Sequence, residues 1–180
     1  MKRIIKLILT SLTIVFLLSL MLALTLYWLI TYRTQGEYFN SGGISIHYTV
    51  EGKSDPVILI HGFAVNSDIN WRRTGVINTL KNNFKVVSLD LRGHGLSGKP
   101  HVPNEYGLKM VSDIINLMDH LKISKAHIAG YSLGGFVALK LATLYPERVK
   151  SLSVLGAGWE EPKENSFFKR ALKNSVEKLE

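Results

Sequence analysis

The fold is decided by the stretch Gly130-Tyr131-Ser132-Leu133-Gly134. It follows a short predicted strand, 126–129, and precedes a segment of helical spacing, 133–145. A serine between two glycines at such a junction is typical of a sharp strand-to-helix turn, where bulkier residues would clash with the neighbouring backbone. The turn lifts the Ser132 hydroxyl above the sheet, beside free N–H groups that favour developing negative charge. The pattern predicts Ser132 as a nucleophile; the alternative is an ordinary turn carrying a solvent-exposed serine.

Two further motifs come directly after predicted strands. His61-Gly62-Phe63 follows the apolar run 57–60, which has the character of a strand buried on both faces. The loop Asp90-Leu91-Arg92-Gly93-His94-Gly95-Leu96-Ser97 follows the β-branched run 84–89. This loop lacks the order G-x-x-x-x-G-K-[ST], which argues against a phosphate-binding loop.

The three motifs, in this order and each at a strand end, resemble those of the α/β-hydrolase family in its serine hydrolase or esterase form. The resemblance covers residues 44–158 and includes Tyr145-Pro146-Glu147-Arg148-Val149, after the nucleophile helix. A serine at the nucleophile position, rather than an aspartate, argues against the haloalkane dehalogenase and epoxide hydrolase branches. The resemblance implies a small-molecule acyl substrate and no metal or organic cofactor.

The resemblance also implies roles for individual residues. The backbone N–H groups of Phe63 and Leu133 are expected to form the oxyanion hole, which requires donors but no particular side chains. The glycines of the elbow and of the oxyanion loop are expected to permit close backbone approach; they are Gly62, Gly130 and Gly134. By the same resemblance His61 lies below the oxyanion loop, so we expect it to be structural rather than a general base. A structural role is also expected for Asp90 and His94.

The remaining members of the catalytic triad are not identified. In this family the chain order is Ser, then Asp or Glu, then His, and no histidine follows His127. Glu160 and Glu161 follow the last predicted strand and are the candidate acids, but they could instead open a cap domain whose first helix is 167–179. We therefore expect a hydrolase sequence truncated before its acid and histidine. The alternative is a catalytically inactive remnant or a membrane-tethered binding protein.

Periodicity alone predicts an α/β fold. Residues 44–50 alternate between apolar and polar types, as in a half-buried strand, and 111–121 have the spacing of an amphipathic helix. The predicted order is strand, strand, then helix and strand in alternation up to a last helix, which implies a mostly parallel sheet with helices on both faces. We assign 44–158 to this core, 34–43 to a polar linker, and 159–180 to the start of a cap or a helix after the last strand.

The first 33 residues have the character of a cytoplasmic tip and a transmembrane anchor. Residues 7–30 contain no charged side chain, and as a helix they would be about 36 Å long, against a hydrocarbon core of roughly 30 Å. Tyr27, Trp28 and Tyr32 cluster at the far end, as in an interfacial aromatic belt. A cleaved signal peptide is the main alternative, but its apolar region is normally about 7–15 residues long.

Charge determines the expected orientation and excludes one class of partner. Lys2, Arg3 and Lys6 precede the apolar segment and only Arg33 follows it closely, so the positive-inside rule places the N-terminus in the cytoplasm and the hydrolase domain outside. The net charge of the chain is +8, but these four residues account for half of it. The remainder is spread out, with no basic stripe and interleaved aromatics, which argues against nucleic-acid binding. The sequence contains no cysteine and gives no indication of the oligomeric state.

Overall fold

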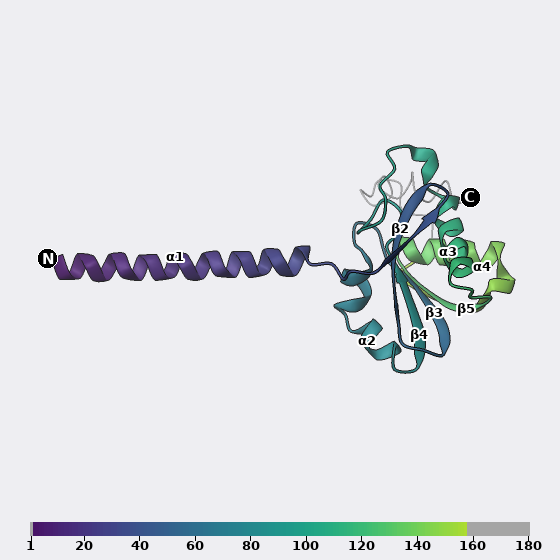
Figure 1. Ribbon diagram of the computed structural model, residues 1–180, viewed down its shortest axis with the longest axis horizontal. Helices are drawn as coiled ribbons and strands as arrows, with labels where there is room; N and C mark the ends of the chain where they lie inside the picture. Colours follow the sequence, from purple (N-terminus) through teal and green to yellow (C-terminus); the bar gives the residue numbers. More distant parts are fainter. Residues whose placement is uncertain (1, 158–180) are drawn as a thin grey trace. The chain divides into compact units, whose positions relative to one another are not determined.

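A computed structural model describes residues 2–157 of the chain. The chain divides into two compact units, Met1–Thr34 and Gln35–Glu180. The first unit consists of the single helix α1, Lys2–Thr31, whose segment Arg3–Trp28 is long and apolar enough to cross a membrane (Figure 1). The rings of Trp28 and Tyr32 lie 5.1 Å apart at its C-terminal end.

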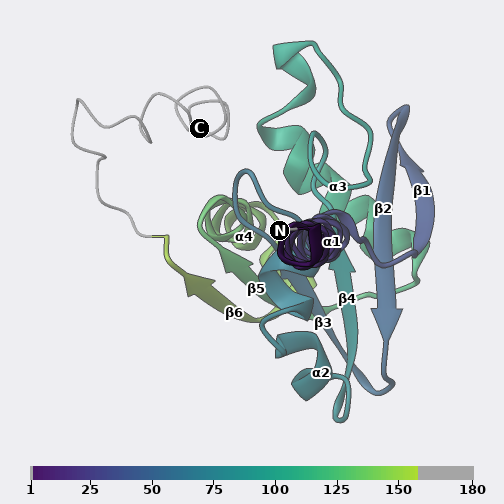
Figure 2. The ribbon, with the colours of Figure 1, turned by 90° about the vertical axis from the view of Figure 1, so that its left-hand side faces the viewer.

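The second unit is built on one six-stranded sheet with the order β1-β2-β4-β3-β5-β6 (Figure 2). The strands β4, β3, β5 and β6 are parallel, and β1 and β2 join them as an antiparallel pair. The mostly parallel α/β sheet predicted from the sequence is therefore confirmed. The strands are β1 (Glu37–Ser41), β2 (Ile44–Glu51), β3 (Asp55–Ile60), β4 (Phe84–Leu89), β5 (Ala126–Tyr131) and β6 (Val149–Leu155). The helices of this unit are η1 (Asp68–Arg72), α2 (Val76–Leu80), η2 (Pro103–Glu105), α3 (Leu108–His120), α4 (Leu133–Leu144) and η3 (Pro146–Arg148).

The linker predicted over 34–43 is wrong in part, because these residues contain the strand β1. This strand pairs with β2 in an antiparallel hairpin whose two-residue turn is Gly42-Gly43. Both glycines have positive φ, 60° and 89°, as a primed hairpin turn requires. The side chains of Phe39 and Ser41 alternate inward and are buried. The core thus begins before residue 44.

The predicted alternation places a helix between the apolar runs 57–60 and 84–89, and the structure divides that helix into two short pieces. The first, η1, is a π-helical turn in which the N–H of Arg73 bonds to the carbonyl of Asp68. Gly75 interrupts the helical backbone with a φ of 83°, and α2 follows it. The helix expected at 167–179 and the candidate acids Glu160 and Glu161 lie outside the described residues.

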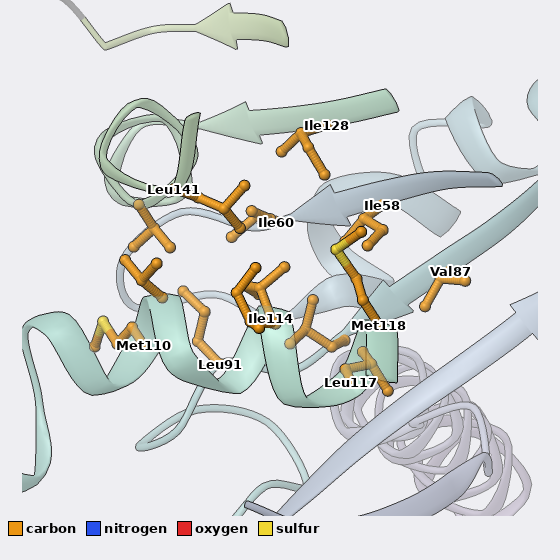
Figure 3. Packing of buried hydrophobic residues seen from close by; sticks show 14 of the residues in the cluster. Ile58, Ile60, Val87, Leu91, Met110, Ile114, Leu117, Met118, Ile128 and Leu141 are labelled. Atoms are coloured by element: carbon orange, nitrogen blue, oxygen red, sulfur yellow. The ribbon is translucent and has the colours of Figure 1, made fainter. Parts of the chain in front are cut away.

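Both faces of the sheet are covered by helices, as the alternation of side chains on β3 shows. Ile58 and Ile60 point into the larger core with α3 and α4, and Figure 3 shows them facing the apolar side of α3. Val57 and Leu59 point to the opposite face, where they pack with Trp71 and with residues of α2 and β4 in a smaller cluster. A strand buried on both sides has no polar face, which explains its continuous apolar run.

We expect Ile58→Ala to lower the free energy of unfolding by about 2–5 kcal/mol, because Ile58 is fully buried and its truncation leaves a cavity between β3 and α3. The matched control is Val102→Ala, since Val102 is 58% exposed; its effect should stay within about 0.5 kcal/mol. Urea unfolding of the full chain in detergent, followed by tryptophan fluorescence, measures both. Equal effects of the two variants would contradict the assignment of Ile58 to the core.

Candidate active site

Ser132 lies at the junction of β5 and α4 in a strained backbone conformation. Its φ is 51° and its ψ is −116°, a region that residues other than glycine rarely adopt. Its N–H donates to the carbonyl of Leu155 at 2.8 Å, and its own carbonyl accepts from the N–H of Gly135 at 2.8 Å. Such strain costs on the order of 1–3 kcal/mol and persists only where the surrounding structure imposes it.

Two glycines allow the backbone to approach itself closely around this serine. A Cβ on Gly130 would lie 2.1 Å from the carbonyl oxygen of Gly134. A Cβ on Gly134 would lie 2.2 Å from the carbonyl oxygen of Ile60, at the end of β3. No side chain fits at either position, because both obstructing atoms belong to the backbone. The first turn of α4 therefore rests directly on the ends of β3 and β5.

The loop after β3 packs against this elbow. A Cβ on Gly62 would lie 3.1 Å from the ring of Tyr131 and 3.4 Å from the Cβ of Ser132. The N–H of Gly62 donates to Oδ1 of Asn70 at 3.0 Å, which ties the loop to η1. The hydrogen bonds of residues 2–157 include none from the backbone N–H of Phe63 or of Leu133. Two unused donors thus lie on the two segments that meet beside Ser132.

His61 is fully buried beneath this loop, and the backbone engages both of its ring nitrogens. Nε2 accepts from the N–H of Leu91 at 2.9 Å, so Nδ1 carries the proton and donates to the carbonyl of Gly62 at 2.7 Å. Burial, which penalises the charged ring, lowers the pKa of His61 to about 4. Because both ring nitrogens already have hydrogen-bond partners, His61 serves as a structural link between β3 and the loop after β4.

Asp90 organises the loop that follows β4. It is 2% exposed and accepts hydrogen bonds from Nδ1 of His47 at 3.1 Å and from the N–H groups of Ser67 and Leu96, both at 2.9 Å. Burial opposes ionisation of this carboxyl, but these donors outweigh it and hold its pKa below the ordinary value. Nδ1 of His94 lies 3.1 Å from the carbonyl oxygen of Arg92, and burial lowers the pKa of His94. These contacts support the structural roles expected for Asp90 and His94.

Sequence reasoning missed several side chains that hold the site in place. Asn70 supports the oxyanion loop, and His47 supports Asp90. Arg92 forms two hydrogen bonds with the buried carboxylate of Asp113 on α3, at 2.7 and 2.6 Å, and a third with the carbonyl of Glu105 at 2.7 Å. Only the polar character of these residues was visible in the sequence, because most of their partners lie far along the chain.

The base that would activate Ser132 is not found among the described residues. The six histidines of the chain all lie within residues 2–157, and none of them hydrogen-bonds to the Ser132 hydroxyl there. The same residues contain no group of three or more His, Cys, Asp or Glu side chains placed to hold a metal ion.

Comparison with known proteins places the chain in a family. A profile of the alpha/beta hydrolase fold matches residues 55–179, more than half of the chain. The chain is a member of the α/β-hydrolase family.

Similar proteins include two bacterial hydrolases. The chain is 33% identical to the 2-hydroxy-6-oxo-6-(2'-aminophenyl)hexa-2,4-dienoic acid hydrolase of Metapseudomonas resinovorans, over 67% of this chain and 42% of that protein. It is also 33% identical to an epoxide hydrolase of Caballeronia sordidicola, over 72% of this chain and 39% of that protein. The chain therefore spans about two fifths of the length of these relatives.

A solved structure agrees with this fold. The meta-cleavage product hydrolase CumD of Pseudomonas fluorescens IP01 superimposes with a TM-score of 0.66 at 35% identity. The match covers 72% of this chain and 47% of that protein.

We expect burial of neutral His61 to make the chain less stable in acid. The folded pKa of about 4 lies below the ordinary value of 6.5, so the unfolded chain binds this proton first as the pH falls. The contribution of the neutral His61 ring to the free energy of unfolding is present in full above pH 6.5. It is lost between about pH 6.5 and 4, and the total loss is about 3 kcal/mol. Urea unfolding at pH 7 and pH 4 measures it, with the non-titrating His61→Gln as control. Parallel losses in the two proteins would contradict the buried neutral ring.

Proposed function

We propose that this chain is a membrane-anchored serine hydrolase that cleaves an ester or similar acyl bond in a small molecule. The observation that carries the proposal is the strained backbone of Ser132 at a strand-to-helix turn, next to the unused N–H groups of Phe63 and Leu133. Strained nucleophile geometry combined with preorganised donors is the arrangement that acyl transfer requires.

In the proposed mechanism Oγ of Ser132 attacks the carbonyl carbon of the substrate. The N–H groups of Phe63 and Leu133 hold the carbonyl oxygen as it becomes negative, the alcohol leaves, and water then hydrolyses the acyl-serine. The serine must lose a proton to a base in the first step. No described residue makes that contact, and the proposed acids, Glu160 and Glu161, lie outside the described residues.

The substrate class is supported by the relatives and by the nucleophile. The similar proteins are named for the hydrolysis of small organic molecules, an unsaturated keto acid and an epoxide. Attack by a serine on an acyl carbon gives an ester that water can cleave in turn. We therefore assign this chain to acyl chemistry rather than to epoxide opening.

The proposed anchor is α1, which would cross the bilayer once through residues 7–30. Its length and apolar composition support this assignment, and so does the aromatic pair Trp28 and Tyr32 at one end. The excess of positive charge before the segment supports a cytoplasmic N-terminus and a hydrolase domain on the other side of the membrane.

The nucleophile is tested by labelling the full chain in detergent with a fluorophosphonate and identifying the modified peptide by mass spectrometry. We expect an adduct on Ser132 because the elbow exposes its hydroxyl beside the oxyanion donors. The adduct should disappear in Ser132→Ala and persist in the control Ser112→Ala, since Ser112 is an exposed serine on α3. A wild-type chain without an adduct on Ser132 would contradict the proposal and favour a membrane-tethered binding protein.

The anchor is tested by extracting membranes with alkaline carbonate. We expect the wild-type chain to stay in the membrane pellet. The double variant Leu17→Arg, Leu18→Arg should move to the supernatant, because each arginine at the centre of a span costs about 2.5–3.5 kcal/mol. The control Thr10→Ala, Thr13→Ala keeps the span apolar and should remain in the pellet. Release of the wild-type chain would contradict the anchor, and protease cleavage of the hydrolase domain from the cytoplasmic side would contradict the orientation.

A further inference from the structure

The strands β3, β5 and β6 lie side by side at one edge of the sheet (Figure 2). One side chain from each of them, an aspartate, a histidine and a serine, takes part in a hydrogen-bonded row. In the strand register His127 on β5 pairs with Ser151 on β6 and with Val57 on β3. Asp55 precedes Val57 by two positions, and residues two apart on a strand share one face. The side chains of Asp55, His127 and Ser151 therefore project from the same face of three parallel strands.

Hydrogen bonds connect these three side chains in a row. Nδ1 of His127 lies 2.7 Å from Oγ of Ser151, and Nε2 of His127 lies 3.1 Å from Oδ2 of Asp55. An ionised carboxylate can only accept, so in the neutral form of the ring Nε2 carries the proton and Nδ1 has the lone pair. The hydroxyl of Ser151 must then donate to Nδ1. This is the polarity by which a histidine activates a serine.

The neighbouring charge keeps the carboxylate in the form that this arrangement needs. Lys150 donates a hydrogen bond to Oδ1 of Asp55, while Oδ2 is left for His127. The bond from Lys150, followed by that from His127, lowers the pKa of Asp55. At neutral pH Asp55 is an anion that orients the ring and stabilises it when it takes up a proton.

The group is accessible from solvent in the described structure. Ser151 is exposed, and the side chains of His127 and Asp55 are 32% and 41% exposed. Ser132 and His127 are five positions apart at opposite ends of β5, which is roughly 17 Å along an extended strand. The two serines therefore belong to separate sites.

We propose that Ser151 is a second nucleophilic serine, activated by His127 and Asp55, that accepts acyl or phosphonyl groups from small activated reagents. With an activated ester, Oγ of Ser151 bonds to the carbonyl carbon and its proton passes to Nδ1 of His127. The carbon–oxygen bond to the leaving group then breaks, and the alkoxide takes that proton. With a fluorophosphonate, Oγ bonds to phosphorus, fluoride leaves, and His127 passes its proton to the buffer.

The experiment is fluorophosphonate labelling of the full chain in detergent, with the adduct on the peptide that contains Ser151 quantified by mass spectrometry against time. The background is Ser132→Ala, so that the elbow serine contributes nothing. We expect Ser151 to be labelled in this background. His127→Gln and Asp55→Asn should each slow its labelling by about 10-fold or more, because they remove the base or its orienting partner.

Ser153→Ala is the matched control, since Ser153 is exposed two positions further along the same face of β6 and pairs with Ala129 rather than with a histidine. It should leave the labelling rate of Ser151 unchanged. A Ser151 that is never labelled, or one labelled equally fast in His127→Gln, would overturn the proposal. Labelling of Ser132 is read separately in Ser151→Ala, so either site can fail without the other.

Discussion

The close approach of Gly134 to the end of β3 is the contact on which the rest of the domain depends. It seats the first turn of α4 on the carbonyl of Ile60 and leaves no room for a Cβ. That seating fixes the path of the chain between β5 and α4, where Ser132 has a φ of 51°. The same contact brings the loop after β3 against the elbow. One packing constraint thus determines the positions of both the serine and the backbone donors proposed to assist it.

Below this contact the strand ends are held by buried polar groups, which must be fully paired to be tolerated. Both ring nitrogens of His61 hydrogen-bond to the backbone. Asp90 accepts hydrogen bonds from a histidine on β2 and from backbone N–H groups of two loops. These residues stiffen the C-terminal rim of the sheet without taking part in the proposed chemistry. His61 ties the end of β3, on which the first turn of α4 rests, to the loop after β4, so the backbone next to Ser132 is held in place.

Those parts of the structure that depend on local sequence could be predicted. The apolar run of β3 and the serine between two glycines are signals contained within a few residues, and the structure has a strand and an elbow at those positions. The strand β1 was missed because Glu37–Ser41 is short and lies in a polar, glycine-rich stretch, although Gly42-Gly43 was a hairpin signal. The hydrogen bond from Gly62 to Asn70 could not be predicted, because a contact between two parts of a folded loop produces no periodic pattern in the sequence. The row Asp55, His127 and Ser151 is similarly hidden, since strand order decides it.

The two serines illustrate how differently the components of a nucleophilic site arise. Oxyanion donors are backbone groups, so a local turn such as that around Ser132 can provide them wherever the chain bends sharply enough. A base and its acid are side chains from separate strands, so only the register of a sheet can align them, as it does for Ser151. Ser132 has donors beside it without a histidine partner in the described residues, and Ser151 has a partly exposed histidine and carboxylate beside it. Because these components reside at opposite ends of β5, neither can compensate for what the other lacks, and each serine must be judged by its own reactivity.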